Sequence, residues 1–210
     1  MTADASALYN AGTTALEQGR IGEAVAFLTA ARRLDPRAAD ISRNLGLAEA
    51  RVHVGRGDDA GPATLGPPAP TLSIGEAWWL AALLLAVAAV AHSARAFRSR
   101  TPPRAGARAV AIVPAALGAL LVAWLAIVAF GERAHPEAVV VAPLLEARRG
   151  ADEAQGPPVL LRAGERVRLG RAAGADVEVR LGGTSIGWAT REGLWRVSDA
   201  PRYTSGFKAR

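Results

Sequence analysis

The residue types that most often carry enzymatic chemistry are scarce in this sequence. Its only histidines, His53, His92 and His135, lie far apart. None has a partner at the spacing of a catalytic triad or a metal site. Cysteine is absent, which excludes a thiolate nucleophile, a zinc-thiolate site and a disulfide framework. These residues therefore predict no metal site and no nucleophilic catalysis.

Two pairs of neighbouring acids are the other candidates for chemistry. Asp58 with Asp59, and Asp152 with Glu153, lie in stretches rich in glycine. Acids in such loops are more often solvated than used as acid-base pairs. No GxGxxG or GxxxxGK run follows an expected strand, so nothing favours nucleotide binding. We expect no catalytic residues, no cofactor and no enzymatic activity.

The positive charge of the chain is concentrated in one short segment. The formal net charge is +6. One segment supplies five positive charges with no acid among them: Arg95, Arg98, Arg100, Arg104 and Arg108. A nucleic-acid surface needs cations spread along a groove with aromatic partners, whereas this segment lies between two apolar stretches. We therefore expect no nucleic-acid binding.

Residues 74–94 and 109–130 are the two apolar stretches. The first has Glu76 and His92 only near its ends, and the second has no charge. At about 1.5 Å per residue, each is long enough to cross about 30 Å of hydrocarbon. The alternative is a buried helical hairpin of a soluble protein, but the remaining chain is too short to surround it. The sequence predicts two transmembrane helices in contact with membrane lipid.

Small and aromatic residues add detail to the predicted hairpin. Trp78, Trp79 and Trp124 lie near the ends that share one interface, where indoles favour the headgroup region. Pro114 is expected to kink the second helix. Alanines recur at helical spacing in both spans: Ala111, Ala115, Ala119 and Ala123, and Ala82 with Ala86. These stripes either let the helices pack closely or reflect composition alone.

The arginine-rich connection predicts the topology. Arginine-rich segments beside spans stay in the cytoplasm, so both termini are expected outside it, at a bacterial inner membrane, in the periplasm. Residues 1–10 have neither a basic n-region nor an apolar h-region of a signal peptide. We expect either that the true start of the chain lies upstream of Met1 or that the first span carries a short tail across.

The N-terminal segment follows the 34-residue tetratricopeptide pattern. Its small and apolar positions are occupied by Leu8, Ala11, Gly12, Ala15, Gly19, Ala24, Leu28, Ala31 and Pro36. Gly12 and Ala24 would let two antiparallel helices touch, and Gly19 would end the first helix. Leu45 and Gly46 begin a second copy, which a Gly- and Pro-rich linker interrupts. An ordinary amphipathic hairpin is the alternative.

An incomplete repeat array predicts an uncovered surface. Such units need about three copies to bury a continuous core. One and a half copies should leave an apolar face for a partner or a second protomer. Residues 1–56 alone should then be weakly stable or self-associating.

The C-terminal segment has the short alternating runs of a small antiparallel barrel. Val167 and Leu169 alternate with arginines, as do the apolar residues of 177–181 with charged ones. GTSIGWATREGLWRV resembles the closing strands of bacterial SH3-like domains. Gly187, Trp188 and Trp195 are expected in the barrel core, with a ligand groove as the alternative for the tryptophans.

The order of these parts resembles BatE proteins of the aerotolerance operon. The resemblance rests on the repeat, the lone helix with Asn44-Leu45-Gly46, the two spans and the SH3-like end. It implies a multidomain membrane protein with an α-helical TPR-like hairpin, a transmembrane hairpin and an all-β SH3-like barrel. The expected segments are 1–56 repeat, 57–73 linker, 74–94 first span, 95–108 cytoplasmic loop, 109–130 second span, 131–137 linker, 138–198 SH3-like domain and 199–210 tail.

The resemblance implies protein partners rather than chemistry. It implies a complex with BatA, BatB and BatD proteins, which include von Willebrand factor A domain proteins, and with a MoxR-type ATPase in envelope stress. The expected function is a membrane-anchored scaffold for protein-protein interactions. The alternative is a cell-wall binding or sensing protein whose SH3-like domain contacts peptidoglycan.

Overall fold

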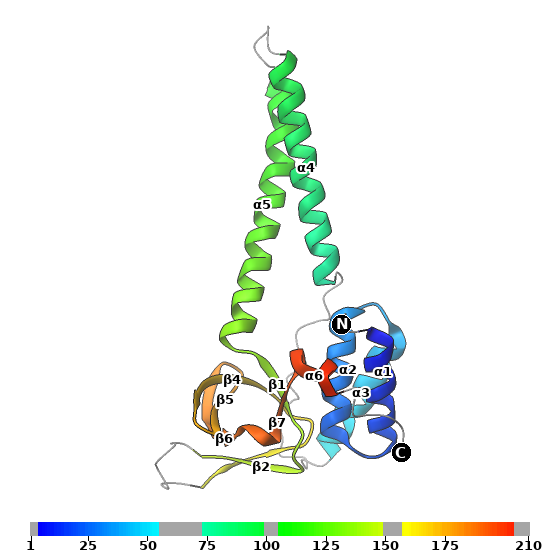
Figure 1. Cartoon of the computed structure of the whole chain (residues 1–210), viewed down its shortest axis with the longest axis vertical. Helices are drawn as coiled ribbons and strands as arrows, with labels where there is room; N and C mark the ends of the chain where they lie inside the picture. The colour runs from blue at the N-terminus through cyan, green and yellow to red at the C-terminus, as the bar shows by residue number, and fades with distance from the viewer. Residues whose placement is uncertain (1–3, 55–72, 99–104, 149–156, 204–210) are drawn as a thin grey trace. The chain divides into compact units, whose positions relative to one another are not determined.

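The computed structural model describes residues 4–54, 73–98, 105–148 and 157–203. The chain divides into two compact units. One unit joins residues 1–71 to residues 132–210, and the other comprises residues 72–131. The long helices of the chain are α1 (Ala5–Glu17), α2 (Ile21–Leu34), α3 (Ala39–Val54), α4 (Ile74–Arg98) and α5 (Ala105–Ala134). The strands and shorter helices follow α5 (Figure 1).

Helices α1 and α2 form a hairpin with clear start and stop signals. Asp4 caps α1 by accepting a hydrogen bond from the backbone N–H of Ser6, at 3.1 Å. Gly19 has a φ of +73°, a conformation that favours glycine and ends the helix. The N–H of Arg20 then donates to the carbonyl of Ala15 at 2.9 Å, which satisfies a helix-end carbonyl. The chain turns here and returns as α2.

The two helices touch where the spacing predicted small residues. A Cβ atom on Gly12 would lie 2.7 Å from Cγ of Leu28, so only glycine fits this contact. The pattern positions of the two helices are all buried: Leu8, Ala11, Gly12, Ala15, Ala24, Leu28 and Ala31. Gly19 and Pro36 lie in the turns that follow α1 and α2.

The C-terminal part of this unit is an antiparallel β module. A five-stranded sheet has the order β6-β5-β4-β1-β7, and β2 pairs with β3. The strands are β1 (Glu137–Val140), β2 (Leu144–Ala147), β3 (Val159–Arg162), β4 (Arg166–Ala173), β5 (Asp176–Leu181), β6 (Thr184–Thr190) and β7 (Leu194–Arg196). The 3₁₀ turn η1 (Arg191–Gly193) separates β6 from β7, and η2 (Val197–Asp199) leads into α6 (Ala200–Tyr203). Every pairing in the described strands is antiparallel.

The β module has its own apolar core, and the predicted tryptophans lie outside it. Val167 and Leu169 pack there with Val177 and Val179, as their alternation predicted. Trp188 is half-buried opposite Glu178 on the outward face of β5 and β6. Trp195 packs against the helices instead. Placing these two side chains in the barrel core was therefore wrong, because the strand alternation directs both outward.

Gly187 closes one end of the module. Its φ is +151°, and a Cβ atom there would lie 2.5 Å from the carbonyl oxygen of Arg148. The Trp188 N–H donates to this same carbonyl at 2.6 Å. Gly187 thus lets the end of β2 approach β6 closely.

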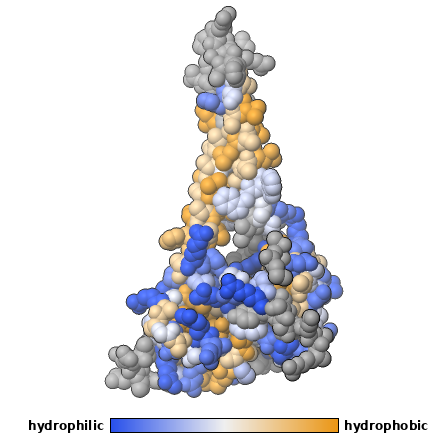
Figure 2. All heavy atoms as spheres, viewed as in Figure 1, coloured by the Kyte–Doolittle hydropathy of each residue, from blue (hydrophilic) through white to orange (hydrophobic). Residues whose placement is uncertain are grey.

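The second unit is a hairpin of two apolar helices. Residues 75–94 of α4 and 112–134 of α5 are long and apolar enough to cross a membrane. Their apolar side chains are largely exposed, among them Trp79 at 80% and Phe130 at 73% (Figure 2). The helices begin and end beyond the predicted spans, since α4 continues to Arg98 and α5 begins at Ala105. Helix α5 runs through Pro114 as one element.

The helices of the hairpin pack on other residues than the predicted stripes. Ala82, Ala86, Ala119 and Ala123 are exposed, and Ala115 is half-buried. The buried positions are instead Ala77, Ala81, Ala88, Gly118 and Leu125. A Cβ atom on Gly118 would lie 3.0 Å from the side chain of Leu85. The buried residues Ala81 and Ala88 on α4, and Gly118 and Leu125 on α5, are spaced seven residues apart, which keeps them on the side of each helix that faces the other. A stripe of every fourth residue instead winds around the helix and away from that side.

The five arginines on which the topology prediction rests have side chains that lie outside the description. Arg100 and Arg104 lie outside the described residues, and so does the side chain of Ala111. Arg95, Arg98 and Arg108 are on helical backbone, and their side chains are also outside the description.

Candidate functional site at the helix-sheet interface

Helix α2 is buried on every side. All residues from Ala24 to Ala31 are buried, including Thr29. Its Ala24, Leu28 and Ala31 side faces α1, while other residues meet the β module. A helix that is apolar all round needs protein on all of its faces. Helix α2 is therefore the central element of this unit.

Strand β1 is the matching element of the sheet. Ala138 and Val140 point into the barrel core, whereas Val139 belongs to the core of the helices. This is the alternation of a strand with both faces buried. Val197 and Ala200 join Val139 in the helical core. The helices and the β module thus share one continuous apolar interior.

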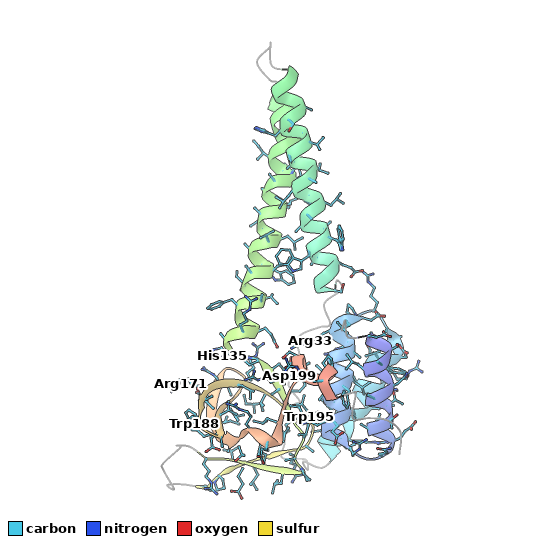
Figure 3. All side chains as sticks on the ribbon, in the orientation of Figure 1. Arg33, His135, Arg171, Trp188, Trp195 and Asp199 are labelled. Atoms are coloured by element: carbon cyan, nitrogen blue, oxygen red, sulfur yellow. The ribbon has the colours of Figure 1, made fainter. Side chains whose placement is uncertain are left out.

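An aromatic pair lies in this shared interior. Phe27 of α2 and Trp195 of β7 meet with ring centroids 5.7 Å apart at 71°. Figure 3 labels Trp195, which lies between the β module and the helices. Edge-to-face pairs of this kind contribute about 0.5 to 1.5 kcal/mol beyond their buried area. Phe27 is fully buried, and Trp195 is one of the side chains that cover it.

Two glycines let the backbones of the helices and the β module approach closely. A Cβ atom on Gly22 would lie 2.5 Å from the carbonyl oxygen of Val140 and 2.7 Å from Cα of Val141. Gly164 lies before β4 with a φ of +91°, and a Cβ atom on it would clash with the side chain of Val52 in α3. Because the Gly22 contact is with backbone, no side-chain rearrangement could relieve it.

A network of ion pairs borders the apolar contact. Glu137 of β1 accepts from Arg33 at 2.6 Å through Oε2 and from Arg166 at 2.7 Å through Oε1. Arg166 also reaches Glu49 of α3 at 3.2 Å, and Arg33 reaches Glu132 at 3.1 Å. The Glu137 side chain is 17% exposed. One carboxylate therefore links α2 to β1 and β4.

The network shifts the pKa values of its members. Burial would raise the pKa of Glu137, but the charges of Arg166 and Arg33 outweigh it and lower that pKa. Burial would lower the pKa of Arg33, but the negative charges of Glu137 and Glu132 outweigh the effect of burial, so the pKa of Arg33 is raised. Burial together with the charge of Arg166 lowers the pKa of the neighbouring Arg32. The Glu137 carboxylate is therefore held ionised.

The β module covers the face that the repeat pattern left open. Glu49 and Val52 of α3 contact Arg166 and Gly164 of the module. Ala26, Phe27 and Ala30 of α2 are buried in the shared core. The expected vacancy for a partner or second protomer on this face is therefore filled by the same chain.

A different helical face stays open, on α1 and α3. The amide of Asn44 donates to the hydroxyls of Thr13 at 3.0 Å and Tyr9 at 3.2 Å. These three side chains are half-buried and lie where the two helices meet. Leu47, three residues after Asn44 on α3, is 53% exposed. This α1–α3 face, defined by Tyr9, Thr13, Asn44 and Leu47, offers hydroxyl and amide groups beside an apolar side chain.

The histidines and acids do not converge. His92 is exposed on α4, and His135 is half-buried at the end of α5, with Nδ1 lacking a hydrogen-bond partner among the described residues. The side chain of His53 and the acids at 58, 59, 152 and 153 lie outside the described residues. In the described part of the chain, no three His, Cys, Asp or Glu side chains gather as metal ligands would.

The sequence reasoning missed the second buried face of α2. The run AVAFLTAA contains no charged residue through two helical turns, which is the signal of a helix enclosed on all sides. No local sequence pattern could indicate the ion-pair partners of Glu137, since Arg33 lies 104 positions away along the chain.

No family model, no curated protein sequence and no solved structure matches the chain.

Proposed function

We propose that this protein is a non-enzymatic scaffold, anchored in a membrane by α4 and α5, that presents a protein-binding surface on one side of the bilayer. The observation that carries this proposal is the shared core of the helices and the β module. Two apolar helices of spanning length are inserted between the two halves of that core. Such a chain is a folded head with an anchor in its middle.

The shared core supports the proposal that the chain crosses the membrane twice, through α4 and α5. Residues before α4 and after α5 contact each other directly through Phe27 and Trp195. Two segments that share an apolar interior must lie in the same compartment. A chain that crosses the bilayer twice meets this requirement. The arginines of the connection favour a cytoplasmic loop, and hence a head in the periplasm of a bacterial inner membrane.

The details of the head support the two proposed modules. Gly12 lies against Leu28 and Gly19 ends α1, as a TPR-like helix pair requires. The strand order β6-β5-β4-β1-β7, with a 3₁₀ turn before the last strand, suits an SH3-like barrel. These features are the basis for proposing repeat-type binding rather than catalysis.

The α1–α3 face is the proposed binding surface. The middle of helix α2, from Ala24 to Ala31, is enclosed on all sides, so these side chains cannot meet a partner. The amide and hydroxyl groups around Asn44 can exchange hydrogen bonds with the backbone of a partner segment. Leu47 offers an exposed apolar contact next to them. By its resemblance to BatE proteins, the partners are membrane-anchored von Willebrand factor A domain proteins and a MoxR-type ATPase system.

Site-specific crosslinking in native membranes tests this proposal. A photoreactive residue at Arg43, exposed on α3, should give adducts that contain a protein of one of these two classes. Asn44→Ala should reduce that yield, because it removes the amide of the proposed binding surface together with its hydrogen bonds to Tyr9 and Thr13. The same photoreactive residue at Glu192, exposed on η1, is the matched control. Adducts from position 192 alone, or a yield unchanged by Asn44→Ala, would contradict the assigned surface.

Cell-wall binding through the β module is the alternative function. The observation that favours it is Trp188, half-buried on the outward face of the sheet, where an indole can stack on a sugar ring. Because the modules share a core, the test uses the whole chain. Retention of the detergent-solubilised protein on purified peptidoglycan, lost in Trp188→Ala and kept in Asn44→Ala, would favour this alternative over the scaffold.

A further inference from the structure

Two arginines lie directly opposite each other on the outward face of the sheet. Arg168 of β4 is the register partner of Arg180 of β5. The adjacent pair, Leu169 and Val179, points into the barrel core, so the arginines point away from it. Residues directly opposite on neighbouring strands have Cβ atoms about 4.5 to 5.5 Å apart. Two positive charges are thus held side by side.

The nearest acids are already engaged. Glu137 is the partner of Arg168 on the other neighbouring strand, but its two oxygens bind Arg33 and Arg166. Glu178, on the same face of β5, accepts from the backbone N–H of Arg171 at 3.2 Å and pairs with the Arg171 side chain at 3.7 Å. Both acids are thus already paired with other arginines, and Glu178 interacts in addition with the charge of Arg180.

The guanidinium groups retain most of their donors. Arg180 donates one hydrogen bond, to the carbonyl of Gly183 at 2.8 Å. Arg168 is exposed, and its side chain makes no hydrogen bond or ion pair with any described residue. Each guanidinium carries five N–H donors in a planar fork. The pair therefore offers many unused donors at one place.

We propose that Arg168 and Arg180 form a binding site for a phosphate group. Like charges directly opposite on a sheet are destabilising, and an anion between them removes that repulsion. A tetrahedral phosphate has enough oxygens to engage two guanidinium forks at once, whereas one fork already satisfies both oxygens of a carboxylate. The phosphate could belong to a lipid headgroup or be free in solution. The site is independent of the protein-binding role of the α1–α3 face.

Thermal unfolding of the full chain tests the site. The protein is kept in uncharged detergent, and unfolding is followed by tryptophan fluorescence while inorganic phosphate replaces chloride at constant ionic strength. Millimolar phosphate keeps its general stabilising effect small. The wild-type midpoint should rise by a few degrees, because a ligand that binds only the folded state stabilises it. Arg168→Gln and Arg180→Gln should abolish the rise, whereas Arg191→Gln, exposed on η1, should keep it.

A second experiment separates the two sources of phosphate. The same variants are reconstituted in nanodiscs of uncharged lipid or of lipid with anionic phosphate headgroups. A rise with anionic lipid that depends on Arg168 assigns a headgroup, and a rise with inorganic phosphate alone assigns a soluble ligand. Arg168→Gln should also be at least as stable as wild type without phosphate, because it removes repulsion. Equal rises in wild type, Arg168→Gln and Arg191→Gln, or no rise in either medium, would overturn the proposal.

Discussion

Helices α2 and α5 are both rich in apolar residues, yet they meet different surroundings. Every residue of α2 from Ala24 to Ala31 is buried by the rest of its unit. In α5, Leu120, Ile127 and Phe130 are each at least two-thirds exposed. The difference is what covers them, since protein covers α2, whereas the proposed membrane anchor would place α5 against lipid. An apolar sequence thus indicates that the surface of a helix must be shielded from water. Only the fold shows whether other protein elements shield it.

The first prediction removes the side chain that joins α2 to the sheet. Phe27→Ala should lower the free energy of unfolding by about 3 to 5 kcal/mol, because it leaves a cavity against Trp195. Denaturant titration of the full chain in detergent, followed by tryptophan fluorescence, measures this loss. Leu34→Ala, at a 44% exposed position of the same helix, should change stability by about 0.5 kcal/mol or less. Equal effects at both positions would contradict the enclosure of α2.

The second prediction places a charge on the other apolar helix. Leu120→Arg should oppose membrane insertion by about 2.5 to 3.5 kcal/mol, because Leu120 lies centrally in the segment of spanning length. The measurement is the fraction of protein that stays with membranes during alkaline extraction. Leu120→Phe should remain fully membrane-bound. Unchanged retention of Leu120→Arg would mean that protein rather than lipid covers α5.

The third prediction compares equivalent glycines one repeat period apart. Gly12→Ala should cost about 1 to 3 kcal/mol, because the new methyl group overlaps Leu28. Gly46→Ala should stabilise the chain by up to about 1 kcal/mol, because it improves helix propensity in open space. Thermal unfolding of both variants measures the difference. Destabilisation by Gly46→Ala would show that the side of α3 that carries Gly46 is covered as well.

The fourth prediction concerns acid and the ion-pair border of α2. The folded pKa of Glu137 lies below its ordinary value of 4.5. The stabilisation from this carboxylate is therefore complete above that value and is lost as pH falls through the folded pKa. Unfolding midpoints measured from pH 6 downward should fall less steeply for Glu137→Gln than for wild type. Glu146→Gln, at a 50% exposed site, should follow the wild-type curve.

Local patterns predicted the elements but not their partners. The contact of Gly12 with Leu28 and the inward Val177 and Val179 follow from spacing within one short segment. The pairing of Phe27 with Trp195 joins residues at opposite ends of the chain, which no local period encodes. A repeat pattern could indicate that α2 and α3 lack cover but not that the cover was the same chain's β module. The candidate site was missed for the same reason.

The hairpin teaches the same lesson at smaller scale. Both apolar segments were evident from their length and lack of charge. Their contact face was not, because Ala82 and Ala123 are as small as Ala81 and Ala88 but point outward. Residue size indicates which positions could pack, and the crossing of the helices selects among them.

Cysteine labelling from each side of the membrane tests the central claim most directly. The chain has no cysteine, so single substitutions give one label each. Ala7→Cys on α1 and Arg191→Cys on η1, both exposed, should react with an impermeant maleimide from the same, periplasmic side. Ser99→Cys, in the arginine-rich connection, should react only from the cytoplasmic side. Labelling of positions 7 and 191 from opposite sides would contradict a single folded head with an anchor in its middle.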